Sequence, residues 1–397
     1  MISVEDARGR VLAALRAVGQ EVVPLAEAYG RVLAADMPAR LAQPPADVSA
    51  MDGYAVRAGD AVPGARLHLI GEAPAGHPFA GSVGQGEAVR LFTGSFVPAG
   101  CDAILIQENT LPTPEGIEVA EAVAAGKHIR RQGQDFALGD VLLAAGRRLT
   151  VRDVALAAAG NHPWVNVFRR PRVAILTTGD EISLPGEALG PGGIVNSNSA
   201  MLAALVSAYG GEPFVLPAAG DDAAAIAAAA DSARGADLLV TTGGASVGAH
   251  DLVQAGLGRK GFALDFWKIA MRPGKPLIFG RIDEMPVLGL PGNPVSAYVC
   301  AVLYLRPALA VLAGQVAAEP VFETARLQGS LGPNDAREDY LRARLHRRDG
   351  GWVVEPFTRQ DSAMLTPLAE AGALLRRPRF QPALADGDVV DIIRLDL

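Results

Sequence analysis

The chain has 397 residues, of which 50% are hydrophobic and 20% charged, and its formal net charge at pH 7 is −7. This length exceeds what one hydrophobic core supports, so we expect several globular domains. An acidic balance without a basic stripe argues against a nucleic-acid partner, whose phosphates would have to be neutralised. The N-terminus lacks the pattern of a signal peptide and no segment predicts a membrane span, so we expect a cytoplasmic protein without membrane attachment. Two cysteines, Cys101 and Cys300, provide neither a disulfide framework nor a zinc site.

The first part of the chain predicts an elongated domain that is interrupted by a β domain. Apolar residues recur at helical spacing over residues 3–36, which predicts two helices, the second over about 25–36. Residues 44–128 are short apolar runs separated by Gly and Pro, the pattern of a small β domain. Residues 129–168 return to mixed structure. We expect them to pack with residues 1–43 as an elongated linker domain.

The second part of the chain predicts an α/β domain followed by a β domain. Strand and helix patterns alternate over residues 169–318, which indicates βαβ units and a mostly parallel sheet. Residues 319–397 are β-like, and a turn at 349–351 predicts a hairpin within a small β-barrel. The predicted fold class is therefore a multidomain α/β protein with an elongated linker domain, an inserted β domain and a C-terminal β-barrel.

The carboxyl ends of the strands in residues 169–318 carry the residues best suited to chemistry, and ligands of open α/β sheets bind beyond such ends. Bare backbone, a hydroxyl, carboxylates and cations occur there: Gly243, Gly244, Ser246, Glu181, Asp251, Lys268, Arg272, Lys275 and the Pro-Gly-Asn-Pro loop 291–294. Glycine amides can bind an anion, carboxylates can hold Mg²⁺, and Lys and Arg neutralise the remaining charge. The mixture predicts a site for a divalent cation and a phosphate-bearing ligand.

Each of these signals also has an ordinary structural interpretation. A Gly-rich turn after a strand is more often plain turn chemistry than a phosphate site. The segment TTGGASVG is neither a P-loop nor a dinucleotide fingerprint. Asp222 precedes an Ala-rich helix, where it is equally well placed as an N-cap.

Seven motifs in chain order carry a family resemblance: SAMDGYAV (49–56), the Thr-Gly and Pro-Gly spacing at 93–100, RRQGQD (130–135), TTGDE (177–181), TTGGASVGAHD (241–251), MRPGKP (271–276) and GLPGNPVS (289–296). With them the chain resembles the molybdopterin molybdenumtransferases, whose fold the C-terminal region of gephyrin shares. SAMDGYAV and GLPGNPVS are the most specific, and the resemblance covers nearly the whole chain. It implies the same domain plan, with a molybdopterin-binding α/β domain at 169–318.

The resemblance also implies a reaction and partners. Such an enzyme takes adenylylated molybdopterin and molybdate as substrates and hydrolyses the adenylate with Mg²⁺, releasing AMP and the molybdenum cofactor. It implies a homodimer whose active site lies at the subunit interface. A molybdopterin adenylyltransferase and apo-molybdoenzymes are the protein partners that such a reaction suggests.

Site residues follow from the resemblance position by position. The catalytic positions are Asp52, Thr93, Glu181, Asp222, Asp251, Lys268 and Lys275. The substrate-binding positions are Gly243, Gly244, Ser246, Arg272, Pro291, Pro294, Ser296, Arg337 and Ser362. Glu181 and Asp251 are the expected Mg²⁺ ligands, and Asp52 and Thr93 would act across the dimer interface. Ser296, Arg337 and Ser362 are suited to an oxyanion such as molybdate.

Two departures and two alternatives qualify this picture. Arg272 stands where the family commonly has Lys, and Asn196 stands where it often has an acid. A clustering scaffold, as the gephyrin region also is, would not need the full acidic and basic set that this chain retains. An adenylyltransferase of molybdopterin would be a single small domain without SAMDGYAV and without the C-terminal β region.

Overall fold

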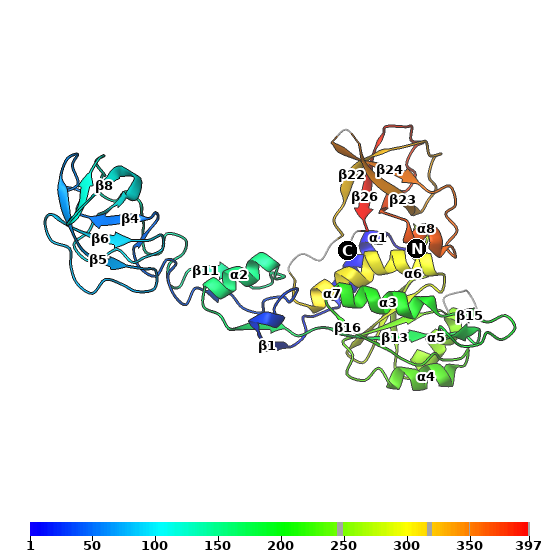
Figure 1. The fold of residues 1–397 in the computed structure, drawn as a ribbon. Coiled ribbons are helices and arrows are strands. Elements are labelled where there is room, and N and C mark those ends of the chain that lie inside the picture. Colours follow the sequence, from blue (N-terminus) through cyan, green and yellow to red (C-terminus); the bar gives the residue numbers. More distant parts are fainter. Residues whose placement is uncertain (244–248, 316–319, 349, 396–397) are drawn as a thin grey trace.

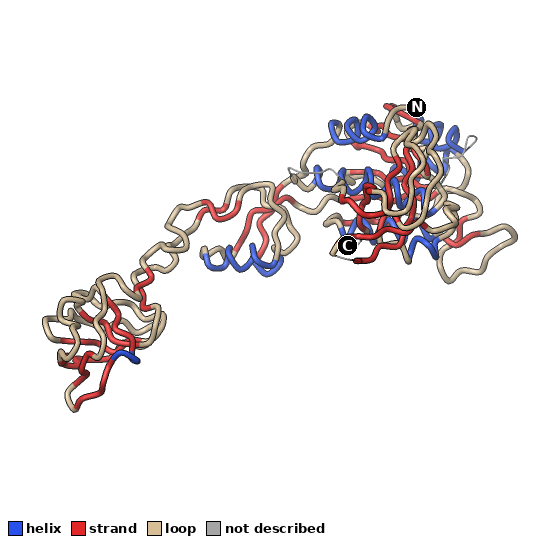
Figure 2. Tube along the Cα trace, turned by 90° about the horizontal axis from the view of Figure 1, so that it is seen from above, coloured by secondary structure: helices blue, strands red, loops and turns tan. Residues whose placement is uncertain are grey.

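The structure is a computed structural model, and it describes residues 1–243, 249–315, 320–348 and 350–395. A small β-rich body lies at one end and a larger body, which carries both termini, lies at the other (Figure 1). A slender linker joins them, and the view from above shows the same dumbbell outline (Figure 2).

The small body is a β domain built on one six-stranded sheet of order β7-β4-β6-β5-β9-β8. Its strands are β4 (Gly53–Val56), β5 (Arg66–Ala73), β6 (Glu87–Leu91), β7 (Ala103–Ile106), β8 (Thr110–Thr113) and β9 (Gly116–Val119). A 3-10 turn, η2 (Gln107–Asn109), connects β7 to β8. Val56, Leu67, Leu105 and Ile117 are buried together inside the sheet, so the alternation of apolar residues accounts for this core.

The linker consists of paired short strands that two chain segments contribute. The pairs are β1 (Gln20–Pro24) with β12 (Trp164–Phe168), β2 (Met37–Pro38) with β11 (Val141–Leu143), and β3 (Val48–Ser49) with β10 (Ile129–Arg130). Helix α2 (Val151–Ala159) packs on them and begins with a capping box between Thr150 and Asp153. The linker is therefore a two-stranded connection, which holds the β domain away from the larger body (Figure 2).

The sequence prediction of a second helix over about 25–36 is wrong. Only a 3-10 turn, η1 (Leu25–Glu27), forms in this segment. Gly30 follows with a φ of 74°, which is not a helical conformation, and Val32 and Leu33 then bridge to residues on neighbouring segments. Buried Leu33 and Met37 pack in the linker core, so tertiary pairing overrides the helical spacing of the apolar residues.

The α/β domain has a six-stranded sheet of order β16-β13-β17-β21-β20-β18. The strands are β13 (Arg172–Thr177), β16 (Glu212–Val215), β17 (Leu238–Thr242), β18 (Ala263–Trp267), β20 (Ile278–Ile282) and β21 (Met285–Leu290). Neighbours among β16, β13, β17 and β21 are parallel, and β20 is antiparallel to both β21 and β18. The predicted mostly parallel sheet is confirmed, although the sequence reading did not identify β18.

Helices cover both faces of this sheet (Figure 1). One face carries α4 (Ala223–Asp231) and α5 (Ala249–Gly258), and the other carries α1 (Val4–Ala13), α3 (Ser197–Ala208), α6 (Pro294–Cys300) and α7 (Arg306–Leu312). A π-helical turn (Ala301–Leu305) joins α6 to α7. The resulting helix, Pro294–Leu312, is the one in the described ranges long and apolar enough to cross a membrane, and 78% of it is buried inside the domain. Its apolar character is that of a core helix.

The C-terminal domain is a closed barrel. Its strands are β22 (Glu323–Leu327), β23 (Glu338–Arg348), β24 (Gly351–Pro356), β25 (Ala373–Arg377) and β26 (Val389–Arg394), with helix α8 (Leu365–Ala369). Strand β23 pairs with both β24 and β25, which closes the ring, and confirms the predicted β-barrel. A two-residue strand of the α/β domain, β19 (Met271–Arg272), adds in parallel to β23.

Candidate active site

A cavity of about 410 Å³ opens at the carboxyl ends of β13, β17 and β21. Its walls come from the strand ends, from the β14 (Ile182–Ser183) and β15 (Ile194–Val195) pair, and from the starts of α3 and α6. The lining residues are Thr177, Thr178, Glu181, Ile182, Ile194, Val195, Asn196, Ser197, Asn198, Gly243, Pro276, Pro291, Gly292, Asn293, Pro294 and Ser296. The cavity thus lies where open α/β sheets bind their ligands.

Five residues that the sequence singled out meet at this cavity: Glu181, Gly243, Pro291, Pro294 and Ser296. Gly243 has a φ of 94°, and a Cβ there would lie 2.2 Å from the carbonyl oxygen of Thr178. Only glycine permits this approach, because the ends of β13 and β17 are in direct backbone contact. The backbone of the cavity wall therefore requires a glycine at this position, whatever ligand the cavity holds.

A network of buried side chains fixes the floor of the cavity. The Asn198 amide donates to Thr242 Oγ1 at 2.9 Å and to the Gly292 carbonyl at 2.7 Å. These two bonds use both N–H donors of the Asn198 amide, so its side-chain carbonyl oxygen is the one polar atom of the side chain still to be paired. That oxygen and Thr178 Oγ1 are buried and have no hydrogen-bond partner within the described part of the chain. An unsatisfied buried polar group costs about 1–3 kcal/mol, so both atoms suit an occupied site better than an empty one.

Asn196, the position where the sequence departs from the family pattern, is also buried here. Its carbonyl oxygen accepts the Ser199 N–H at 3.1 Å and so caps α3, and its amide donates to Thr177 Oγ1 at 3.1 Å. Asparagine thereby supplies one acceptor and one donor where an acid would supply acceptors only.

Asp222 caps α4 through its carboxylate, which accepts the Ala225 N–H at 2.8 Å. It is not among the cavity residues, so the geometry matches the helix-cap interpretation. Asp180 is similarly engaged, since its carboxylate accepts the Asp221 N–H at 2.9 Å.

The three basic residues of the FWKIAMRPGKP segment have different surroundings. Lys268 has a φ of 72°, and its ammonium lies 3.5 Å from the centre of the Trp267 ring. Lys275 directly precedes Pro276 of the cavity wall. Arg272 is engaged elsewhere: its guanidinium donates to both oxygens of Asp339, at 2.9 and 2.6 Å. This pairing raises the pKa of Arg272.

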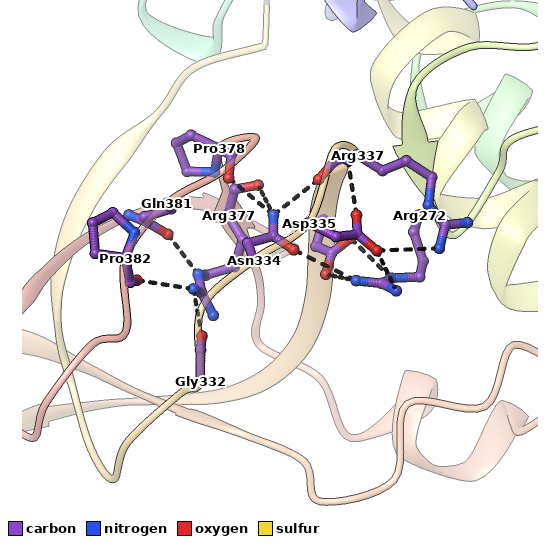
Figure 3. Close-up of polar contacts among 10 residues, drawn as sticks. Arg272, Gly332, Asn334, Asp335, Arg337, Arg377, Pro378, Gln381 and Pro382 are labelled. Carbon is purple, nitrogen blue, oxygen red and sulfur yellow. Dashed lines mark hydrogen bonds and ion pairs between the residues drawn. The ribbon is translucent and has the colours of Figure 1, made fainter.

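Arg337 lies beside Arg272, in a loop of the C-terminal barrel. Both guanidinium groups approach Asp335, Arg272 at 3.3 Å and Arg337 at 3.5 Å (Figure 3). Asn334 shapes this loop, because its amide nitrogen lies within 3.0 Å of the carbonyl oxygens of Arg337, Arg377 and Pro378. Because Arg272 belongs to the α/β domain and Asp335 to the C-terminal barrel, their contact links these two domains.

Ser362 joins the barrel to the cavity at a second point. Its hydroxyl accepts the Asn293 amide at 2.8 Å, and its carbonyl accepts the Val295 N–H at 3.1 Å. Both donors belong to the Pro-Gly-Asn-Pro loop and the start of α6. Ser362 and Ser296 thus lie on neighbouring segments.

Asp52 and Thr93 lie on the β domain, remote from the cavity of the same chain (Figure 1). The Asp52 carboxylate accepts the Thr93 N–H at 2.8 Å and the Thr93 hydroxyl at 2.9 Å. These bonds, with the charge of Arg90, lower the pKa of Asp52. The next residue, Gly53, has no room for a side chain, because a Cβ there would lie 2.2 Å from the carbonyl oxygen of Leu105.

Three family models match the chain. They are the MoeA N-terminal region (domain I and II) at residues 2–160, the "Probable molybdopterin binding domain" at 174–311, and the MoeA C-terminal region (domain IV) at 324–395. The chain belongs to the molybdopterin molybdenumtransferase family. The resemblance stated from the sequence is thereby confirmed, and with it the expectation of an enzyme of molybdenum cofactor biosynthesis.

Individual relatives agree with the family assignment. The chain is 36% identical to "Molybdopterin molybdenumtransferase 2" of Mycobacterium tuberculosis over 99% of both chains, and 37% identical to the Haemophilus influenzae molybdopterin molybdenumtransferase over 99% and 98%. The crystal structure of the molybdopterin biosynthesis moea protein from Pyrococcus horikosii covers 100% of both chains with a TM-score of 0.88 at 30% identity. Likeness over the whole length disfavours the adenylyltransferase alternative, which would be one small domain.

Some predicted residues of this family member lie outside what the structure describes. Gly244 and Ser246 are among them, and of Asp251 only its place in α5 is known. Among the described residues, no group of three or more His, Cys, Asp or Glu side chains is arranged to hold a metal ion. Conversely, the sequence reading assigned no role to Thr178, Asn198 or Asn293. Thr178 and Asn293 belong to motifs quoted from the sequence, but the burial of Thr178 and the hydrogen bond from Asn293 to Ser362 could not be read from those motifs.

Proposed function

We propose that the chain inserts molybdate into adenylylated molybdopterin and hydrolyses the adenylate in a Mg²⁺-dependent reaction, releasing AMP and the molybdenum cofactor. The observation that carries this proposal is the cavity at the strand ends, where Glu181, Gly243 and Ser296 meet. Two helices, α3 and α6, begin at its wall. Their positive N-terminal ends favour an anionic ligand.

The oxyanion donors come from two domains. Ser296 lies on the cavity wall, and Ser362 reaches the same loop from the barrel. With Arg337 they would bind molybdate, a tetrahedral dianion. In this proposal Lys268 and Lys275 stabilise charge that develops on the phosphate. Arg272 contributes by fixing the loop of Arg337, since Asp339 and Asp335 already occupy its guanidinium.

One carboxylate at the cavity, Glu181, fits the requirement of Mg²⁺ for one or two protein carboxylates. Glu181 and Asp251 would hold the ion, which supplies a Lewis acid for the phosphoanhydride when bound. The glycine turn after β17 would seat the pterin and its phosphate. Asp222 retains its cap and supports the start of α4.

The proposed assembly is a homodimer in the cytoplasm, in which the β domain of one subunit faces the cavity of the other. Asp52 and Thr93 would then complete the site from the partner subunit. The length of the linker supports this arrangement, because it holds the β domain away from the cavity of its own chain (Figures 1 and 2). A molybdopterin adenylyltransferase would supply the substrate, and apo-molybdoenzymes would receive the product.

Purified full-length protein tests this function when incubated with adenylylated molybdopterin, molybdate and Mg²⁺. We expect AMP release and transfer of the cofactor to an apo-molybdoenzyme, both lost on chelation of Mg²⁺. The Asp251→Asn variant should fold normally and lose Mg²⁺-dependent AMP release. If the wild-type protein yields neither AMP nor cofactor, the enzymatic proposal fails and the scaffold alternative takes its place.

A further inference from the structure

The segment 357–364 of the C-terminal barrel carries Ser362 to the cavity loop, and one buried arginine holds this segment. Arg342, on β23, has 0% of its surface exposed. Its guanidinium donates to the carbonyl oxygens of Met364 at 2.7 Å, Asp361 at 3.0 Å and Arg359 at 3.2 Å. These three carbonyls lie on both sides of Ser362 in the sequence.

A second set of bonds fastens the same segment to the backbone of Arg342. The Gln360 side chain accepts the Arg342 N–H at 3.1 Å and donates to the Arg342 carbonyl at 2.9 Å. The Phe357 N–H also donates to that carbonyl, at 3.1 Å. The segment therefore depends on one residue of β23 through both its side chain and its main chain.

Arg342 differs from the other arginines near the site. Arg272 and Arg337 are paired with carboxylates, whereas the side-chain hydrogen bonds of Arg342 go to main-chain carbonyls. It does not line the cavity. A buried charge that satisfies carbonyl groups organises a loop and cannot reach a ligand from this position.

We infer that Arg342 is a positioning residue for the molybdate subsite, acting through the 357–364 segment and Ser362. This inference rests on the proposed function for the identity of the oxyanion. The route is continuous: the guanidinium fixes the carbonyls around Ser362, and Ser362 bonds to Asn293 and Val295 at the cavity loop. Removal of the guanidinium takes a donor from each of the three carbonyls, of which that of Asp361 still accepts the Met364 N–H at 3.2 Å, so the segment must rearrange.

The first test measures hydrogen exchange in the full-length protein and needs no activity. In Arg342→Met, we expect the Val295 amide to lose protection, because its acceptor is the Ser362 carbonyl. Ser362→Ala keeps that carbonyl and should keep the protection. The matched control is Arg31→Met in the linker, where another buried arginine donates to a main-chain carbonyl, that of Phe168, at 2.9 Å. It should leave Val295 unchanged, and unchanged protection in Arg342→Met as well would overturn the inference.

The second test measures the KM for molybdate against kcat. Arg342→Met and Ser362→Ala should each raise KM about tenfold with a smaller change in kcat, and the double variant should exceed the larger single effect by no more than about twofold. Arg342→Lys keeps one donor and should recover part of the affinity; it also carries the test if Arg342→Met does not fold. Multiplying effects in the double variant would overturn the route through Ser362. A wild-type protein without activity would reject the proposed function, and the exchange experiment would still decide the role of Arg342.

Discussion

The surroundings of the two groups of predicted site residues are built in opposite ways. Around the cavity, Asn196, Asn198 and Thr178 are buried, and the strand ends touch through glycine. At the far end of the molecule, Asp52 and Thr93 are exposed and bond mainly to each other. Substitution of a buried cavity residue should therefore disturb stability together with function. Substitution in the Asp52–Thr93 pair should disturb function with little effect on stability.

The largest expected effect tests whether the two groups meet in a dimer. Asp52→Asn and Glu181→Gln alter exposed side chains, and each should reduce AMP release by at least about a hundredfold with little change in thermal stability. When both variants are co-expressed, mixed dimers contain one site with neither substitution, so about a quarter of the wild-type activity should return. Two variants that both alter the same cavity, Glu181→Gln and Asp251→Asn, are the control and should not complement. A mixture that stays inactive would argue against a shared site.

The next effect concerns Gly243. An alanine there would place its Cβ 2.2 Å from the Thr178 carbonyl oxygen at a φ of 94°, so we expect a loss of at least ~3 kcal/mol in the free energy of unfolding. Gly258→Ala at the end of α5 is the control, because no atom lies within 4 Å of its Cβ position. Urea unfolding of the two variants measures the difference. Equal stability would show that the strand ends can separate at little cost.

A smaller effect is expected at Asn198. Asn198→Ala removes the donors to Thr242 and Gly292 and should lower the free energy of unfolding by about 2 kcal/mol. Asn166→Ala is the matched control, since its amide makes one exposed bond to Gln20 at 3.2 Å and should change stability by less than about 0.5 kcal/mol. If Asn198→Ala is as stable as this control, the buried network does not hold the cavity floor.

The smallest effect concerns the ionisation of Asp52. Its pKa is lowered first by the Thr93 N–H and then by the Thr93 hydroxyl, so Thr93→Val should raise the pKa only partly toward its ordinary value. Because the pKa in the folded protein is depressed, the stabilisation from this carboxylate is present above its unfolded pKa and disappears as pH falls through the folded pKa. NMR titration of the Asp52 carboxyl group measures the shift. An unchanged pKa of Asp52 in Thr93→Val would assign the contribution of Thr93 to its backbone N–H alone.

The sequence predicted those parts of the fold and site that depend on local pattern. The alternation of strand and helix patterns predicted the α/β sheet. Glu181, Gly243 and Pro291 were placed at strand ends from the sequence, and in the structure they line one cavity. The segment around Gly30 was misread, because apolar residues at helical spacing serve a small core of paired strands there. The roles of Asn198 and Arg342 depend on partners far along the chain, such as Gly292 and Met364, and no local pattern records them.

The short strand β19 makes the MRPGKP segment part of two domains at once. Its backbone pairs with Glu338 and Asp339 of the barrel, while the chain continues four residues after Arg272 into the cavity wall at Pro276. A version of the protein cut after the α/β domain would therefore expose an unpaired main-chain edge and leave Arg272 without its carboxylates. The barrel thus holds in place a segment that continues into the wall of the candidate active site. Exchanging the barrel for that of a relative would require residues 271–276 to be exchanged with it.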